Sequence, residues 1–290
     1  MSRSTGSGEV VGRGTALGPS DPTWIARYRL LRRLGAGGMG LVYLGEAPDG
    51  TPVAVKVIRP EYADDTVYRR RFHQEAQAAA RVRDPGVARV LDHDTAGPSP
   101  FLVTEYVPGP SLRDRVHDGG PLAGAELDAF ARGVARGLAG IHAAGVVHRD
   151  LKPQNVILSP AGPRIVDFGI ARALDAVTRW TTTGEIVGSV GWMAPEVLRQ
   201  QPVTAASDVF SWGATVAYAA TGRRPFGDGP DIGVAHRVLA GPPPDLAGVP
   251  PWLAPLVVAA LAPDPRARPS AAALAAGAVD VRPDVRPDPT

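Results

Sequence analysis

The sequence contains no cysteine, and other features that mark particular protein classes are missing too. Without thiols the chain forms neither disulfides nor zinc-thiolate sites, and none of its six histidines pairs with another at metal-ligand spacing. No dense run of Lys and Arg is interleaved with aromatic residues, so nucleic acid is not an expected partner. The first residues also lack the apolar core of a targeting signal.

Long hydrophobic runs are absent as well. The longest late run, residues 253–262, is interrupted by Pro255 and is too short to cross a bilayer. A formal net charge of +2 gives no strong field of either sign. We therefore expect no membrane span in this chain and a cytoplasmic location, which would also suit the intracellular part of a longer, membrane-anchored receptor.

Enough apolar sequence is nevertheless present to bury a large core. With 290 residues, 44% of them hydrophobic, the chain can form one large domain or two lobes. Residues 1–24 are rich in Gly, Ser and Thr and aperiodic, which predicts a disordered leader. The repeated Val-Arg-Pro-Asp predicts a disordered Pro/Asp-rich tail over 277–290, and leaves an ordered domain over 25–276.

A glycine-rich turn lies between two strand-like runs near the start of that domain. Residues 35–40 read Gly-Ala-Gly-Gly-Met-Gly, and strand-like residues 28–34 and 41–44 flank them. Glycines let backbone amides approach phosphates with no side chain in the way. A dinucleotide site would need a helix directly after the turn, so the following strand disfavours that alternative.

A single charge, Lys56, interrupts the next predicted strand, residues 51–58. An ammonium inside a strand is costly to bury unless phosphates or a carboxylate meet it, although a lysine can also reach solvent from an edge strand. Glu75 falls on the apolar stripe of a predicted helix over 66–82, beside Phe72 and Ala79. We expect Lys56 and Glu75 to form an ion pair.

The most polar cluster runs from His148 to Asn155, reading His-Arg-Asp-Leu-Lys-Pro-Gln-Asn. An apolar helical pattern over 127–141 precedes it and a short strand over 156–158 follows, so this cluster is predicted to be a loop held between two buried elements. Further on, a strand ends in Asp167-Phe168-Gly169. Taken alone, the first motif could be an ordinary polar loop and Asp167 a turn former.

Together these motifs resemble those of the bacterial Hanks-type, eukaryotic-like Ser/Thr protein kinases. The resemblance covers about 28–276 and includes the glycine loop, Val-Ala-Val-Lys, the helix glutamate, His-Arg-Asp, Asp-Phe-Gly and Ala194-Pro195-Glu196. It implies an α+β, two-lobed protein kinase fold. A small antiparallel-sheet lobe with one helix is expected over 25–107 and a larger helical lobe over 108–276, with ATP between them.

The resemblance also assigns roles. Asp150 would orient and deprotonate the acceptor hydroxyl, Lys152 would neutralise the transferring phosphoryl group, and Asn155 and Asp167 would hold Mg²⁺, or Mn²⁺ in its place. Lys56 and Glu75 complete the catalytic set. The implied nucleotide-binding residues are Gly35, Ala36, Gly37, Gly38, Met39, Gly40, Val42, Ala54, Lys56, Glu105, Val107 and Ile157.

Further residues receive structural or regulatory roles by the same resemblance. Asp208, which could also be a helix N-cap, would brace the catalytic loop, and Arg268 would pair with Glu196. Thr181 and Thr183 are the expected autophosphorylation sites, with Arg149 as the cation that meets their phosphates.

The partners implied are proteins with Ser or Thr acceptors, and a homodimer for phosphorylation in trans. A pseudokinase scaffold or ATP-binding module is the main alternative, but it would normally have lost Lys56, Asp150 or Asp167. A small-molecule kinase would usually lack Ala-Pro-Glu, and a tyrosine kinase would not be expected to carry Lys152 at this position.

Overall fold

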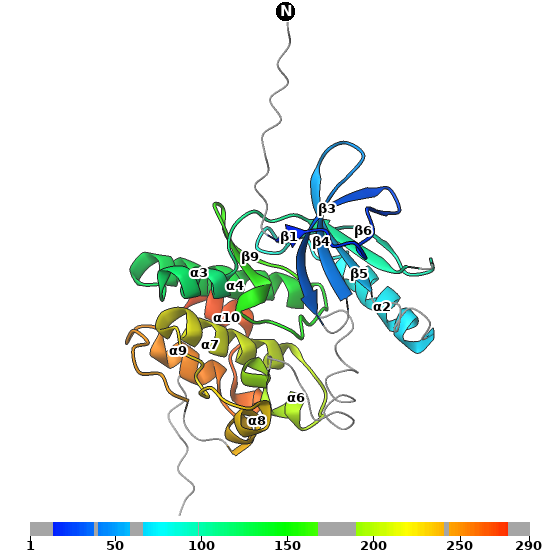
Figure 1. Cartoon of the computed structure of the whole chain (residues 1–290). Helices are drawn as coiled ribbons and strands as arrows, with labels where there is room; N and C mark the ends of the chain where they lie inside the picture. Colours follow the sequence, from blue (N-terminus) through cyan, green and yellow to red (C-terminus); the bar gives the residue numbers. More distant parts are fainter. Residues whose placement is uncertain are drawn as a thin grey trace, which may run out of the picture.

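The computed structural model describes residues 14–37, 40–58, 66–97, 99–167, 190–240 and 244–277. They form two lobes that differ in secondary structure (Figure 1). The smaller lobe holds a β-sheet and one long helix, and the larger lobe is mainly helical. This arrangement confirms the predicted α+β, two-lobed architecture.

The sheet of the smaller lobe is antiparallel, with the strand order β1-β3-β4-β5-β7-β6 and with β2 paired to β3. Alternating burial explains why residues 52–58 form strand β5. Val53 and Val55 point into the core, while Ala54 and Lys56 lie half-buried on the other face. The strand bounds are β1 Thr15–Ala16, β2 Trp24–Ile25, β3 Tyr28–Gly37, β4 Gly40–Glu46, β5 Pro52–Ile58, β6 Val90–Asp94 and β7 Phe101–Glu105.

The predicted disorder of residues 1–24 is wrong for residues 14–24. Strand β1 pairs with β3 at Arg32 and Arg33, and the side chain of Asp21 binds Arg33 and Tyr43. Polar side-chain contacts rather than apolar periodicity order this segment, so composition alone missed it. Residues 1–13 and 278–290, the rest of the predicted leader and most of the tail, lie outside the described residues.

Helix α2 (Thr66–Ala79) packs its predicted apolar stripe, which includes Phe72 and Ala76, into the core. It ends before the predicted residue 82, since the N–H groups of Arg81 and Val82 bond three residues back instead of four. The strand-like sequence runs 88–92 and 101–107 correspond to β6 and β7, whose observed ends differ from those runs by two residues. Boundaries of this kind depend on local hydrogen bonds that the apolar pattern does not encode.

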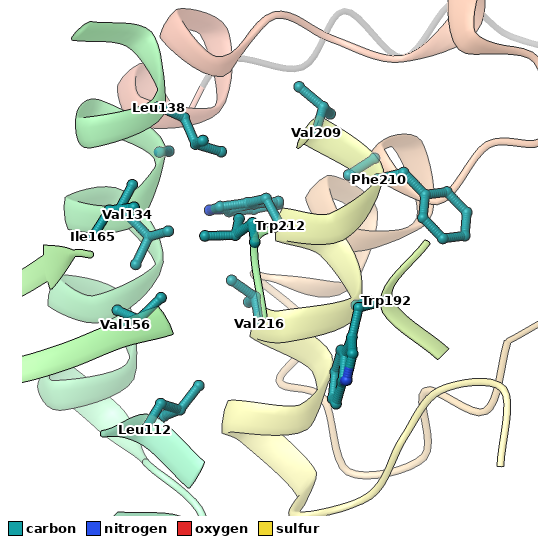
Figure 2. Packing of buried hydrophobic residues seen from close by; sticks show 14 of the residues in the cluster. Leu112, Val134, Leu138, Val156, Ile165, Trp192, Val209, Phe210, Trp212 and Val216 are labelled. Carbon is teal, nitrogen blue, oxygen red and sulfur yellow. The ribbon is translucent and has the colours of Figure 1, made fainter. Parts of the chain in front are cut away.

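The larger lobe is built around α4 and α7. Val134 and Leu138 of α4 lie opposite Trp212 and Val216 of α7 (Figure 2), and the indole N–H of Trp212 donates to the Ala131 carbonyl at 3.0 Å. Helix α7 is buried almost all round, as its apolar sequence predicts. The helix bounds are α3 Leu112–Gly119, α4 Gly124–Ala143, α6 Pro195–Leu198, α7 Ala205–Thr221, α8 Asp231–Ala240, α9 Ala254–Ala260 and α10 Ala271–Ala276.

A short hairpin, β8 (Val156–Ser159) and β9 (Gly162–Ile165), packs on α4 beside the polar loop. The loop itself thus runs from the end of α4 to the start of β8, with a 3₁₀ turn at Pro153–Asn155. Of the helices in the described ranges, none combines the length and apolarity needed to cross a bilayer.

Candidate active site

The polar loop after α4 is held by the buried carboxylate of Asp208, at the start of α7. Its two oxygens accept the backbone N–H groups of His148 at 2.7 Å and Arg149 at 2.8 Å, and His142 Nε2 lies 2.9 Å away. The predicted brace is therefore present. The alternative of an N-cap is wrong, because Thr204 is the N-cap of α7.

His148 connects this loop to the strand end that carries Asp167. Its fully buried ring lies with Nε2 3.3 Å from the Val166 carbonyl, and Nδ1 accepts the Asp150 N–H at 3.3 Å. Burial lowers the pKa of His148. A neutral ring with its proton on Nε2 satisfies both contacts, so His148 joins the two predicted catalytic segments without adding a charge.

Asp150, Lys152 and Asn155 converge as predicted. The Lys152 ammonium lies 2.8 Å from Asp150 Oδ2, and Asn155 Nδ2 donates to the carbonyl of Asp150 at 2.8 Å and to its Oδ2 at 3.1 Å. The 3₁₀ turn makes this possible, because the Asn155 N–H returns to the Lys152 carbonyl. One carboxylate, one ammonium and one amide are thus fixed around a shared oxygen.

The predicted ion pair between Lys56 and Glu75 is wrong in this structure. Lys56 Nζ pairs with Asp167 Oδ1, whereas Glu75 pairs with Arg149. The Lys56 and Arg149 side chains are 16% and 32% exposed, so each cation needs a carboxylate nearby. Both cations have a carboxylate partner, but Lys56 has Asp167 in place of Glu75, and Arg149 has Glu75. The apolar stripe of α2 could not reveal that an arginine competes for Glu75.

Two of these residues adopt left-handed backbone conformations. Arg149 has φ of 67° and Asp167 has φ of 56°, values that non-glycine residues rarely adopt. Backbone strain of this kind persists where the surrounding structure imposes it, and it is concentrated at functional sites. Asp208 imposes it at Arg149 by binding the backbone on that side of the loop.

Burial also affects the ammonium of Lys152. It lowers the pKa of Lys152 to about 8, with nearby Lys56 acting in the same direction and Asp167 opposing it. This cation therefore loses its charge at a much lower pH than an exposed lysine would.

Asn155 and Asp167 fit a hard divalent cation. The amide nitrogen of Asn155 is committed to Asp150, which leaves its oxygen as the ligand atom, and the Val166 N–H bonds to the Asn155 carbonyl at 2.9 Å. That bond sets Asp167, the next residue, beside Asn155. Carboxylate and amide oxygens are the donors that Mg²⁺ prefers. In the described part of the chain, no cluster of three His, Asp or Glu side chains offers another metal centre.

Those of the predicted nucleotide-binding residues that the structure describes come from five strands, β3, β4, β5, β7 and β8, and, for Val107, from the chain just after β7. Val42 pairs with Lys56 and Gly35 across the sheet, and Ala54 pairs with Thr104. Val107 and Ile157 are buried together with Ala88 in a small apolar cluster. Position 40 requires glycine for a steric reason, since a Cβ there would lie 2.2 Å from the Val57 carbonyl oxygen. Gly38 and Met39 lie outside the described residues, as do Thr181 and Thr183.

Glu105 has a structural role besides its predicted one. Its side chain accepts from Arg164 at 2.7 Å and from the Arg89 N–H at 3.2 Å, and this ties the end of β7 to β9. A hollow of about 890 Å³ lies beside it, lined by Tyr28, Pro52 and Leu91 among others. Lys56, Asp150 and Asp167 do not line that hollow, so we do not assign the chemistry to it.

The predicted pair of Glu196 and Arg268 is confirmed and buried. Arg268 donates through both terminal nitrogens to the two carboxylate oxygens, at 2.7 and 2.9 Å. The hydroxyl of Ser207 adds a third hydrogen bond at 2.8 Å, which the sequence did not suggest. The pair connects the start of α6 with the chain before α10.

Comparisons with known proteins agree with this geometry. The family model described as protein kinase domain matches residues 28–277. Probable serine/threonine-protein kinase PkwA of Thermomonospora curvata is 48% identical over 260 residues, which are 90% of this chain and 35% of that protein. Serine/threonine-protein kinase AfsK of Streptomyces griseus is 46% identical over 82% of this chain and 29% of its own length.

A solved structure is similar over nearly its whole length. The Mycobacterium tuberculosis PknI kinase domain is 28% identical, with a TM-score of 0.69, and the match covers 90% of this chain and 98% of that one. The chain spans about a third of the length of the first two relatives, at 35% and 29%.

Proposed function

The chain belongs to the protein kinase family, and on that premise we propose that it is a Ser/Thr protein kinase that transfers the ATP γ-phosphate to hydroxyls of proteins. The observation that carries this proposal is the cluster of Asp150, Lys152 and Asn155 around one carboxylate oxygen, braced by Asp208. Lys152, two residues after Asp150, favours Ser and Thr over Tyr as acceptors.

In the proposed reaction Asp150 accepts the proton of the acceptor hydroxyl as the hydroxyl oxygen attacks the γ-phosphorus, and the bond from that phosphorus to the bridging oxygen breaks, so that ADP leaves. Lys152 then neutralises charge on the transferred phosphoryl group, and Lys56 orients the remaining phosphates. Asn155 and Asp167 would hold the divalent cation, for which we propose Mg²⁺, with Mn²⁺ as a substitute. When bound, the cation neutralises phosphate charge during the transfer.

ATP would bind along β3, β4 and β5, with its adenine at the end of β7. There the backbones of Glu105 and Val107 would bind the base, while Ala54 and Ile157 offer apolar contact. The glycine-rich turn over 35–40 would cover the phosphates. These contacts follow from the family resemblance and from the placement of the strands.

The exchanged ion pairs correspond, in this proposal, to a resting state. Phosphoryl transfer requires an ion pair between Lys56 and Glu75 and requires Asp167 as a metal ligand. Here Lys56 pairs with Asp167 instead, and Arg149 pairs with Glu75. We propose autophosphorylation of Thr181 and Thr183, whose phosphates would compete for Arg149 through charge-assisted hydrogen bonds. Glu75 would then turn to Lys56.

A pseudokinase or ATP-binding module is the second candidate, and one observation favours it. Lys56 occupies the carboxylate of Asp167 that the metal needs. If that pair were permanent, the chain would bind nucleotide without transferring phosphate. Retention of Lys56, Asp150 and Asp167 together favours the enzyme.

A homodimer is the partner we propose for phosphorylation in trans, and proteins with Ser or Thr acceptors are the proposed substrates. We place the domain in the cytoplasm. The relatives are longer than this chain, so the domain would be either a separate enzyme or the intracellular part of a longer receptor. Sequencing the gene beyond the codon for Thr290 would decide between those two forms.

The test is incubation of the protein with ATP and Mg²⁺, followed by mass-spectrometric mapping of phosphate on the chain and on a generic basic protein. Wild type should label Thr181, Thr183 and the added protein, and Asp150→Asn should label nothing. ATP binding with no transfer by the wild type would establish the second candidate instead. A Thr181→Ala/Thr183→Ala variant should bind ATP normally but transfer phosphate slowly.

A further inference from the structure

An ordered segment precedes the first residue that the protein kinase model matches, residue 28. We call this segment, residues 14–25, the N-terminal strap. It runs antiparallel along β3, pairing through β1 with Arg32 and Arg33 and through β2 with Tyr28 and Arg29. Without it, β3 would be the open edge of the sheet.

The strap is fitted closely to β3. Gly14 has φ of 105°, and a Cβ there would lie 2.2 Å from the Arg33 carbonyl oxygen, so only glycine permits this approach. The Gly14 carbonyl accepts from Arg32 Nη2 at 2.6 Å. Leu17 packs against the core cluster of the smaller lobe, which includes Tyr43. The strap is thus held against β3 and the core by close backbone packing, by a hydrogen bond and by apolar contact.

Asp21 is the centre of this contact. Its carboxylate accepts the Gly18 N–H at 2.7 Å, the Tyr43 hydroxyl at 2.8 Å and the Arg33 guanidinium at 2.5 Å. The side chain is 1% exposed. Bonds from Arg33, Gly18 and Tyr43 lower the pKa of Asp21 to about 2, so it stays ionised at any ordinary pH.

The two residues outside the strap that Asp21 binds are a cross-strand pair. Arg33 on β3 lies directly opposite Tyr43 on β4, and the register shifts immediately afterwards, between Arg33 and Gly35. This pair lies next to the register shift, on the side away from the glycine-rich turn, and the β3–β4 pairing continues beyond it as far as Arg29 and Glu46. Between this shift and the turn the strands contain Gly35, Gly37 and Gly40, and Gly-rich strands hold their register weakly, so a clamp from outside the hairpin has a clear use.

We propose that the N-terminal strap belongs to the nucleotide-binding apparatus, with Asp21 as a positioning residue that holds the β3–β4 hairpin in register for the ATP phosphates. This inference rests on the proposed kinase function, because it assumes that the glycine-rich turn meets ATP. Asp21 touches no substrate, and it acts through Arg33 and Tyr43.

The chain supplies a matched control. At the other end of β3, Asp92 accepts from Tyr28 and Arg27, each at 2.8 Å, which forms a second arrangement of Asp, Arg and Tyr. It binds the same strand but lies away from the hairpin turn. Asp92→Asn and Asp21→Asn therefore remove similar interactions at opposite ends of β3.

The experiment measures the Kd for ATP, the KM for ATP, the KM for a protein acceptor and kcat in the full chain. For Asp21→Asn we expect Kd and KM for ATP to rise about tenfold, the change that loss of one charge-assisted hydrogen bond produces. The acceptor KM and kcat should stay within about twofold, because Asp150 and Lys152 are untouched. Asp92→Asn should leave the Kd for ATP unchanged.

An unchanged Kd for ATP in Asp21→Asn would overturn the inference, as would an equal rise in Asp92→Asn. If Asp21→Asn does not fold, Tyr43→Phe removes one of the three bonds with no change in shape. It should raise the Kd for ATP about threefold, and a wild-type Kd in that variant would count against the clamp. Wild type that binds no ATP would overturn the proposed function itself, which separates the two failures.

Discussion

The guanidinium of Arg149, directly before Asp150, forms an ion pair with Glu75 of α2. The same carboxylate is the one that phosphoryl transfer requires beside Lys56, which here pairs with Asp167. In the proposed active arrangement Lys56 would pair with Glu75, a phosphate would pair with Arg149 and the metal would take Asp167, so each ion pair that breaks is replaced by another. A modest new interaction, such as a phosphate at Arg149, is then enough to change the populations.

This relationship predicts the behaviour of Arg149→Gln. In phosphatase-treated protein we expect the variant to transfer phosphate about fivefold faster than wild type, since a partly exposed ion pair of about 1 kcal/mol no longer holds Glu75. Autophosphorylation should then raise its rate little further, because the cation that meets the phosphate is gone. Initial rates before and after incubation with ATP measure both effects.

The control is Arg136→Gln, which removes an exposed arginine from α4. It should match wild type in both states. A dephosphorylated Arg149→Gln that is slower than wild type would show that the pair with Glu75 does not restrain the enzyme.

The sequence predicted the catalytic loop well because its residues are contiguous. Eight consecutive residues bring Asp150, Lys152 and Asn155 within reach of one another once the flanking helix and strand are placed. The brace by Asp208 and the pair of Glu196 and Arg268 were also correct, but they were predicted from the family resemblance, since the partners are distant in sequence and no local pattern links them.

The errors have a common physical origin. The stripe on α2 predicts which face Glu75 occupies, but not how far that face lies from Lys56, and Arg149 competes from another lobe. Nothing in the sequence indicated the role of Asp21, because the Gly/Ser-rich segment that contains it has the composition of a disordered leader. Its order comes from Arg33 and Tyr43, which are distant in sequence.

Lys56→Met and Asp150→Asn should each abolish autophosphorylation while the circular dichroism spectrum stays unchanged. Neither side chain is part of the apolar core, and loss of an essential positioning or charged group costs about a hundredfold or more in kcat. Asp167→Asn should likewise abolish turnover at ordinary Mg²⁺ concentrations. Turnover like that of wild type in any of the three would remove that residue from its assigned role.

The buried pair of Glu196 and Arg268 predicts a loss of stability rather than of chemistry. Their side chains are 5% and 0% exposed, so Arg268→Met should lower the free energy of unfolding by about 3 kcal/mol, because Glu196 would be left buried and unneutralised. Glu196→Gln/Arg268→Met should be less destabilised than Arg268→Met, since no buried charge remains. Urea denaturation of both variants gives the comparison, and equal losses would contradict it.

The pair also makes stability depend on pH. Burial opposes ionisation of Glu196, but the bonds from Arg268 and Ser207 prevail and lower its pKa below the ordinary value. A carboxyl group whose folded pKa is depressed stabilises the protein above its unfolded pKa, and that contribution disappears as pH falls through the folded pKa. The difference in free energy of unfolding between wild type and Glu196→Gln/Arg268→Met should therefore become smaller as the pH is lowered.

Lys152 predicts an alkaline limit to activity. Burial lowers its pKa to about 8 in the free enzyme, so the ammonium loses its proton as pH rises through that value. The proposed role needs the charged form, hence kcat/KM for ATP should fall above about pH 8, because this ratio reports ionisations of the free enzyme. The limit on kcat itself should lie at higher pH, since bound phosphates favour the ammonium.

Lys152→Arg tests this assignment, because a guanidinium stays charged throughout the accessible range. Its turnover should be lower, as an arginine does not place its charge where the shorter ammonium sits beside Asp150, but its kcat/KM should no longer fall near pH 8. Circular dichroism at each pH would separate this effect from unfolding. If Lys152→Arg shows the same decline as wild type, another group sets the alkaline limit, and the charge on Lys152 is not what the reaction loses there.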